Sequence, residues 1–194
     1  MCGIIGAASS RNVGKLLVQG LHKMEYRGYD SAGIALHQKD SIFNLRTLGK
    51  VSLLEDGMIE QRPKSKLGIA HTRWATHGQP SEENAHPHAS SGEVHIVHNG
   101  IIENYLELTD KLTKEGYTFK SETDSEVIAH LLHQNFQSSV SLVAGDASTG
   151  RTTVDVVYAN GEEERIFDVT GATIYPGTSI LGFTTLSPVK LYTG

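Results

Sequence analysis

Cys2 has the clearest chemical potential in this sequence, because a cysteine thiol is an intrinsically strong nucleophile. It directly follows Met1, and removal of Met1 would leave the cysteine with a free α-amino group. A free α-amine has a pKa of about 7.7–8.0, close to working pH, whereas a free thiol has a pKa of about 8.5. The amine can therefore act as the base that activates the thiol. The alternative is a small buried apolar residue, so the rest of the sequence must decide.

Later segments carry side chains suited to holding a small charged substrate. Arg73 can bind a carboxylate through two parallel hydrogen bonds, and Trp74 can form an aromatic wall or lid. Asn99 can donate from its side-chain amide, and Gly100 allows a backbone N–H to approach a ligand closely. Asp124 precedes a predicted helix, where it could bind a ligand or simply cap the helix.

Each of these residues lies where a predicted element begins or ends. The hydrophobic pattern predicts strands at 3–8, 33–36, 42–45, 67–71 and 94–97 and helices at 13–24, 101–113 and 126–132. Asn12 is placed to cap the first helix, and Gly116 to end the second. The elements would thus present the polar residues at the ends of strands.

The composition changes at about residue 135. All ten histidines and the only tryptophan precede this point. The small, polar segment 138–150 is typical of a linker, and Asn160-Gly161 between two alternating runs is a hairpin signal. We expect a core at 1–137 and a β-rich tail at 138–194, which either completes the fold or is an appended segment.

Composition excludes several classes of protein. The net charge is −5 with no basic stripe, so we expect no nucleic-acid partner. No run approaches the roughly 18 apolar residues of a membrane span, and the N-terminus lacks a signal-peptide pattern, so we expect no membrane partner. A single cysteine cannot form an internal disulfide, which fits the cytoplasm.

The histidine pairs His86/His88 and His95/His98 could in principle chelate a metal. No cysteine pair or acidic partner stands at ligand spacing, so hydrogen bonding and packing are the favoured roles. We expect neither a metal nor another cofactor.

Six motifs together resemble a known family in wording, order and spacing. They are Met1-Cys2-Gly3-Ile4-Ile5-Gly6, Tyr26-Arg27-Gly28-Tyr29-Asp30-Ser31-Ala32-Gly33, residues 71–78, His86-Pro87-His88, His98-Asn99-Gly100-Ile101-Ile102-Glu103-Asn104 and Thr123-Asp124-Ser125-Glu126-Val127-Ile128. Over residues 1–134 the sequence resembles the N-terminal glutaminase domain of the glucosamine-6-phosphate synthase (glutamine–fructose-6-phosphate aminotransferase) family. Other class II glutamine amidotransferases share the opening Cys-Gly-Ile and the Asn-Gly but would not be expected to carry the rest of this wording.

The resemblance implies an α+β fold, a four-layer αββα sandwich of the N-terminal-nucleophile hydrolase type, here with an atypical β-rich C-terminal segment. It implies Cys2 as the nucleophile and an oxyanion hole formed by Asn99 and the Gly100 N–H. It also implies that Arg73 binds the α-carboxylate of L-glutamine and that Asp124 binds its α-ammonium group. Neither a metal nor a cofactor is implied.

The remaining implied positions surround the substrate or the nucleophile. They are Trp74, Thr76 and His77 in a loop that closes over the substrate, Arg27 and Gly28, which would hold the loop beside the Cys2 amine, and His86 in a supporting role.

The sequence departs from the family in its tail, which does not align with the later part of the family's glutaminase domain. The sugar-phosphate isomerase half is also absent from this chain, so we expect hydrolysis of glutamine to glutamate and ammonia rather than complete aminosugar synthesis. Two alternatives remain: a non-catalytic binding or assembly module with an incomplete pocket, and the glutaminase half of another class II amidotransferase.

Overall fold

The computed structural model describes residues 2–27, 29–39, 41–75 and 78–135, and four later strands at 143–146, 153–157, 163–168 and 179–184. The chain divides into two compact units, the first ending at Pro87 and the second beginning at His88. Each unit has its own sheet and hydrophobic core. Among the described residues, no helix has the length and apolar character that crossing a membrane requires.

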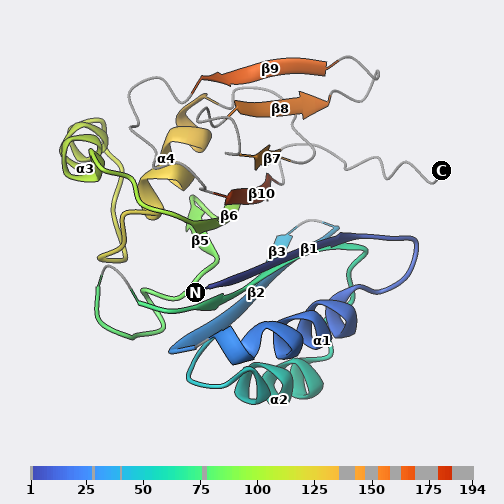
Figure 1. Ribbon diagram of the computed structural model, residues 1–194. Helices are drawn as coiled ribbons and strands as arrows, with labels where there is room; N and C mark the ends of the chain where they lie inside the picture. Colours follow the sequence, from blue (N-terminus) through green and yellow to red (C-terminus); the bar gives the residue numbers. More distant parts are fainter. Residues whose placement is uncertain are drawn as a thin grey trace. The chain divides into compact units, whose positions relative to one another are not determined.

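The first unit contains an antiparallel sheet of strand order β1-β4-β2-β3. Its elements are β1 (Gly3–Ala8), α1 (Gly14–Met24), the short 3-10 helix η1 (Glu25–Arg27), β2 (Ser31–Gln38), β3 (Ser41–Leu48), α2 (Val51–Gln61) and β4 (Leu67–Arg73). Helices α1 and α2 lie along the same face of this sheet (Figure 1). The first predicted strand, the first predicted helix and the predicted pair of strands on either side of 38–40 are confirmed.

Alternate residues of β2 form the centre of the first core. Ala32, Ile34 and Leu36 face the buried residues of α1 and α2, because side chains two apart on a strand point to the same face. The core consists of Val13, Leu17, Val18, Leu21, Ala32, Ile34, Leu36, Val51, Leu54 and Ala70. This packing holds the ends of β1 and β4, where the candidate residues lie.

Helix α2 was missed in the sequence. Its interior contains Gly57, a poor helix former, which weakens the helical pattern. The structure explains this glycine: a Cβ there would lie 2.8 Å from the Leu45 side chain of β3. Gly57 therefore allows the helix to approach the sheet closely. Asn12 was expected to cap α1, but Val13 stands at the cap position; the Asn12 side-chain oxygen accepts hydrogen bonds from the N–H groups of Gly14 (3.3 Å) and Ser65 (3.1 Å).

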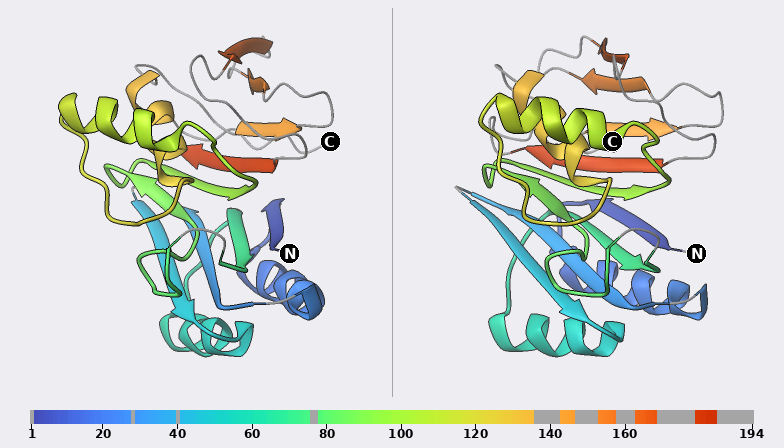
Figure 2. Two further views of the ribbon diagram at one scale, coloured as in Figure 1. Left: turned by 60° about the vertical axis from the view of Figure 1, so that its left-hand side comes forward. Right: turned by 90° about the vertical axis from the view of Figure 1, so that its left-hand side faces the viewer.

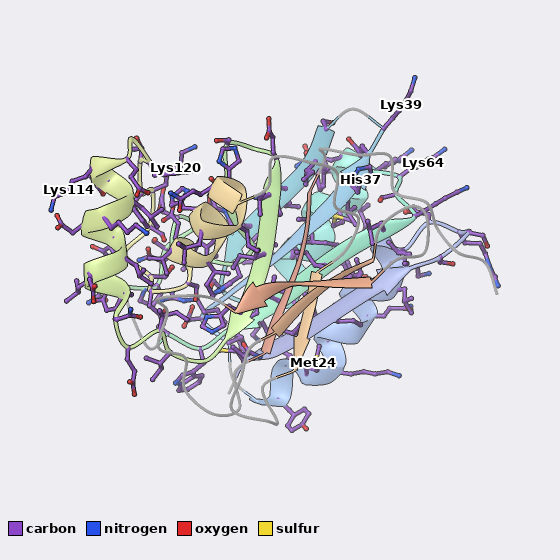
Figure 3. The ribbon with its side chains drawn as sticks, turned by 90° about the horizontal axis from the view of Figure 1, so that it is seen from above. Met24, His37, Lys39, Lys64, Lys114 and Lys120 are labelled. Atoms are coloured by element: carbon purple, nitrogen blue, oxygen red, sulfur yellow. The ribbon has the colours of Figure 1, made fainter. Side chains whose placement is uncertain are left out.

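Two lysines and a histidine lie at the end of the first unit near the β2–β3 turn (Figure 3). His37, Lys39 and Lys64 lie at this end (Figure 3), where the Ser65 hydroxyl donates to the His37 carbonyl oxygen. Burial lowers the pKa of His37 below its usual value, against a smaller opposing effect of a backbone hydrogen bond. Because Ser31 at the other end of β2 pairs with Arg73, these charges lie away from the candidate residues of this unit.

The second unit contains a six-stranded sheet of order β5-β6-β10-β7-β8-β9. Its elements are β5 (His88–Ser90), β6 (Val94–Asn99), α3 (Tyr105–Lys114), α4 (Glu126–Asn135), β7 (Val143–Asp146), β8 (Thr153–Val157), β9 (Glu163–Asp168) and β10 (Ser179–Thr184). Figure 2 shows α3 and α4 together beside the β5–β6 part of this sheet. Val94 and Ile96 of β6 share a core with both helices, which includes Leu112 and Leu132.

Two expectations about the second unit need correction. The helix predicted from residue 101 begins at Tyr105, and residues 101–104 form a loop in which the Ile102 N–H donates to the carboxylate of Asp124. The segment 138–150, predicted as a linker, contains strand β7. Gly116 follows α3 with φ 97°, and the helix predicted at 126–132 is confirmed as α4.

The tail strands belong to the sheet of the second unit. β10 pairs with β6 in antiparallel register from Ser179 opposite Asn99 to Thr184 opposite Val94, and it pairs with β7 on its other side. β8 and β9 form the predicted antiparallel pair, while residues 158–162 between them lie outside the described residues. The boundary at 137/138 stays a prediction, separate from the division at Pro87.

Candidate active site

The pairing of β1 with β4 places Cys2 beside the end of β4. Gly3 is opposite Thr72, and the Gly3 N–H donates to the Thr72 hydroxyl at 3.0 Å. A Cβ on Gly3 would lie 2.8 Å from that hydroxyl and 2.9 Å from the Cβ of Met24. The glycine after Cys2 is therefore required by a close approach between strand and helix.

The sulfur of Cys2 is oriented by the main chain of Trp74. The Trp74 N–H donates to the Cys2 sulfur at 3.1 Å, and the thiol lies 3.6 Å from the Trp74 carbonyl oxygen. Cys2 is half-buried, whereas the Trp74 side chain is 55% exposed. The nucleophile candidate thus has a fixed direction while remaining accessible from one side.

Arg73 ends β4 and is buried in a polar setting. Its guanidinium lies 3.6 Å from the Asp30 carboxylate, and it donates to the carbonyl oxygens of Gly78 (3.1 Å) and Gln79 (3.5 Å). Only 4% of Arg73 is exposed. A buried guanidinium with a carboxylate partner keeps its charge and its direction.

Asp30 is a candidate site residue that the sequence reasoning did not select. Its carboxylate accepts the N–H of Ala75 and the hydroxyl of Ser31, and its own N–H donates to the Arg73 carbonyl oxygen at 2.8 Å. Asp30 therefore holds both Arg73 and the segment that follows it. Its signals in the sequence were its place at the end of a polar loop directly before a strand and its position inside the motif at residues 26–33.

The other predicted residues of the first unit are only partly described. His86 is buried, and its ring stacks on that of His71 with centroids 4.1 Å apart, so it packs within the first unit. Arg27 is the last residue of η1, and its side chain is outside the described part. Gly28, Thr76 and His77 also lie outside the described residues.

In the second unit, Asn99 and Gly100 lie at the point where β6 ends. Asn99 ends the strand, and Gly100 has φ 149°, a conformation that residues with a side chain rarely adopt. Two residues later, the Ile102 N–H donates to the Asp124 carboxylate at 2.7 Å. Asp124 is 3% exposed, and this contact joins it to a segment other than the helix that it precedes. The structure thus brings Asp124 to the loop that contains Asn99 and Gly100.

The segment around Asp124 is fixed by a network of buried side chains. Thr123 contacts His88 at 2.9 Å, and Ser125 contacts His98 at 2.8 Å, so the neighbours of Asp124 are tied to β5 and β6. This gives the paired histidines a hydrogen-bonding role. Within the described residues, no group of three or more potential ligands is placed to hold a metal ion.

Glu126, at the start of α4, holds the turn that precedes Asp124. Its carboxylate accepts the N–H groups of Lys120 (2.9 Å) and Ser121 (2.7 Å) and the Ser121 hydroxyl (2.6 Å), and it lies 3.6 Å from His130. Burial raises the pKa of Glu126, but the nearby His130 ring and the hydrogen bonds from Ser121 and Lys120 lower it to about 2. Glu126 is therefore a charged, buried anchor.

Solved structures of similar fold define the class of the fold. The glutamine phosphoribosylpyrophosphate amidotransferase of B. subtilis superposes with a TM-score of 0.64, 18% sequence identity and coverage of 87% of this chain and 50% of that chain. A structure described as the allosteric regulatory enzyme of purine biosynthesis gives a TM-score of 0.65, with 19% identity over 87% of this chain and 49% of that chain. The α+β fold is therefore confirmed as that of these proteins.

Sequence comparisons identify the domain more closely. Residues 71–152 match the family described as a glutamine amidotransferase domain. The glutamine–fructose-6-phosphate aminotransferase [isomerizing] of Legionella pneumophila (strain Paris) is 47% identical over 186 residues, 93% of this chain and 31% of that protein. The protein of the same name from Pseudomonas aeruginosa is 55% identical over 139 residues, 71% of this chain and 23% of that protein.

Residues 71–152 therefore match an enzyme domain, the glutamine amidotransferase domain, and the predicted resemblance to the aminotransferase family is confirmed. The chain spans about a third or less of the length of these curated relatives. The 186-residue alignment is longer than the 134 residues of the predicted match, so it extends into the tail.

Proposed function

We propose that this chain hydrolyses L-glutamine to glutamate and ammonia, with Cys2 as the nucleophile. The observation that carries the proposal is that the Trp74 N–H orients the Cys2 sulfur. The residue just before Trp74 in the chain is Arg73, whose guanidinium is buried. A nucleophile and a group that can hold the α-carboxylate of an amino acid are thus neighbours in one unit. The match to a glutamine amidotransferase domain supports this choice of substrate.

The chemistry requires two steps at the γ-amide of glutamine. The Cys2 sulfur forms a bond to the carbonyl carbon of this amide while its α-amine takes the thiol proton, which then leaves with ammonia as the C–N bond breaks. Water hydrolyses the resulting γ-glutamyl thioester and regenerates the thiol. Asn99 and the Gly100 N–H stabilise the oxyanion in both steps.

Substrate recognition is assigned to the two charged ends of glutamine. Arg73 binds the α-carboxylate and Asp124 the α-ammonium group. Trp74, Thr76 and His77 belong to the loop that closes over the substrate. Arg27 and Gly28 hold the loop beside the Cys2 amine, and His86 supports it. The thiol must stay reduced to react, so we place this activity in a reducing compartment, the cytoplasm.

The proposed architecture is the four-layer αββα sandwich. Support comes from each unit on its own, since each pairs one sheet with helices on one face. We further propose that the tail completes the second sheet, because β10 lies between β6 and β7. Deleting residues after 138 would then expose the edge of β6 and yield an insoluble or molten chain. A soluble truncated chain with full glutaminase activity would show that the tail is an independent appendage.

The physiological acceptor is proposed from the relatives. Their identity of 47–55% favours ammonia supply for aminosugar synthesis over another amidotransferase reaction, with the acceptor half provided by a sugar-phosphate isomerase domain. That half lies beyond the part of the relatives that this chain covers.

The test is a glutaminase assay on the purified chain, with its intact mass measured. We expect glutamate and ammonia from protein that lacks Met1, and loss of activity when a glutamine-like thiol alkylator adds once, at Cys2. Residues appended before Cys2 should abolish turnover until they are cleaved off, because the base becomes an amide. Protein without Met1 that neither reacts with the alkylator nor hydrolyses glutamine would support the non-catalytic alternative.

A further inference from the structure

The loop that contains Asn99 and Gly100 is fastened at both ends to two consecutive residues. Before the loop, the Nδ1 atom of His98 lies 2.8 Å from the Ser125 hydroxyl. After it, the Ile102 N–H donates to the Asp124 carboxylate at 2.7 Å. The His98–Ser125 and Ile102–Asp124 contacts, here called the loop clamp, therefore enclose residues 99–101.

The two halves of the loop clamp are also joined to each other. The Ser125 hydroxyl lies 3.4 Å from the Asp124 carboxylate, to which it can donate. A serine hydroxyl has a single hydrogen, so when it donates to Asp124 it accepts from the Nδ1–H of His98. His98, Asp124 and Ser125 are each at most 3% exposed, so water does not compete for these bonds.

The loop needs such a clamp because of its glycine. Gly100 has φ 149°, and glycine loses more conformational freedom on folding than any other residue. A donor that stabilises an oxyanion must be held at a fixed distance from it, since catalysis depends on donors that are already in position. The contacts that limit this loop at both ends therefore bear on the rate of reaction.

We propose that Ser125, acting through His98, is a positioning residue that fixes the Asn99–Gly100 loop for oxyanion stabilisation. This inference rests on the proposed function of that loop. Ser125 does not touch the substrate in this scheme. It sets the direction from which the chain enters the loop, whereas Asp124 combines substrate binding with restraint of the loop exit.

The second unit contains a matched contact that serves as a control. Ser90 of β5 and the Nδ1 atom of His130 of α4 are also 2.8 Å apart. These residues are 1% and 3% exposed, as buried as the Ser125 pair. Ser90→Ala thus removes the same kind of serine–histidine bond from the same unit, and neither Ser90 nor His130 forms part of the loop clamp.

The experiment compares Ser125→Ala, Ser125→Thr and Ser90→Ala in the full 194-residue chain. Each variant is assayed for kcat and KM with glutamine, for binding of glutamate, and for inhibition by the γ-aldehyde analogue of glutamine. The Cys2 sulfur adds to the aldehyde carbon, the C=O π bond breaks and the thiol proton ends on the oxygen. Inhibition by the aldehyde therefore reports on oxyanion stabilisation. Glutamate binding reports on recognition of the α-carboxylate and the α-ammonium group.

Removal of an oxyanion donor costs about 10²–10³ in rate, so loosening one should cost less, on the order of tenfold. We expect Ser125→Ala to lower kcat and weaken aldehyde inhibition on the order of tenfold, with KM and glutamate binding changed by less than about threefold. Ser125→Thr should restore most of both, because it keeps the hydroxyl. Ser90→Ala should leave kcat and aldehyde inhibition close to their wild-type values, even if its melting temperature falls as much as that of Ser125→Ala.

Each outcome decides the matter. Equal effects of Ser125→Ala and Ser90→Ala on kcat and on aldehyde inhibition would overturn the proposal, as would an effect confined to KM. If Ser125→Ala does not fold, His98→Asn, which keeps a donor near the Nδ1 position, takes its place. Its kcat and its inhibition by the aldehyde should fall by less than tenfold. Unchanged values of both would contradict the proposal. A wild-type chain without glutaminase activity would instead overturn the proposed function, and this inference with it.

Discussion

The two units hold their candidate residues in different ways. In the first unit, Cys2 is placed by main-chain contacts: the pairing of β1 with β4 and the Trp74 N–H at its sulfur. In the second unit, Asp124 is placed by buried side chains, with Ser125 tied to His98. Cys2 is half-buried and Asp124 is 3% exposed.

This difference has a consequence for mutation. The pairing of β1 with β4 survives substitution of the Cys2 side chain, although the contact of its sulfur with the Trp74 N–H is lost. Changes at the nucleophile should therefore alter chemistry while leaving the fold intact. Side-chain networks do not survive substitution, and a buried polar group left without its partner lowers the free energy of unfolding by about 1–3 kcal/mol. Changes at the side chains that hold the Asn99–Gly100 loop, such as Ser125, should therefore alter stability and catalysis together.

The largest effect expected is that of Cys2→Ala. It removes the covalent route, so glutamine hydrolysis should be lost completely, while the melting temperature and near-UV circular dichroism should stay those of the wild type. Production of glutamate by the purified variant measures the effect. Turnover near the wild-type rate, or loss of the fold, would contradict the first half of the comparison.

Asn99→Ala should have the next largest effect. An oxyanion donor acts mainly on the transition state, so kcat should fall by about 10²–10³ with a much smaller change in KM. Asn104→Ala is the matched control, because it replaces another asparagine, the residue just before α3. It should keep kcat close to wild type. A change in KM alone at Asn99 would refute its role.

Substitutions at the Arg73–Asp30 pair should act on KM instead. Arg73→Ala leaves the substrate carboxylate without a charged hydrogen-bond partner worth about 1.5–3 kcal/mol, so KM should rise roughly 10- to 100-fold. Asp30→Asn keeps an acceptor for the Ala75 N–H but removes the charge 3.6 Å from Arg73. It should raise KM less than Arg73→Ala, and a larger effect on kcat than on KM in either variant would contradict the assignment.

The sequence predicted most of the elements around the site because their hydrophobic periods are regular. β1, α1, the β2–β3 pair and α4 follow from local pattern alone. Helix α2 did not, since Gly57 is explained by contact with Leu45 on another strand. The start of α3 did not either, since residues 101–104 form a loop that contacts Asp124, which is distant in the chain.

The candidate site divides in the same way. Cys2, Arg73, Asn99 and Asp124 could be selected from residue type and motif, and the structure places them at the ends of strands or just before a helix. The contacts that hold them could not be predicted, because they join residues far apart in the chain. Asp30 meets Arg73, and Ser125 meets His98, only through the pairing and packing of separate elements.

The smallest expected effect on activity, but a clear one on stability, concerns Glu126. Its carboxylate is 2% exposed and has a pKa of about 2, below the usual 4.5. A carboxylate with a lowered folded-state pKa stabilises the protein fully above pH 4.5, and this contribution is lost as the pH falls from about 4.5 towards 2.

Glu126→Gln removes this charge but keeps one oxygen to accept from Lys120 or Ser121. We therefore expect its free energy of unfolding to be lower than that of the wild type by up to about 3 kcal/mol at pH 7, and the difference to shrink below pH 4.5. Denaturant unfolding of both proteins at pH 7 and pH 3 measures this. Because Glu126 holds the turn before Asp124 without reaching the substrate, kcat and KM at pH 7 should change only a few-fold. A difference in stability that stays constant between the two pH values would show that packing at Glu126, and not its charge, holds this turn.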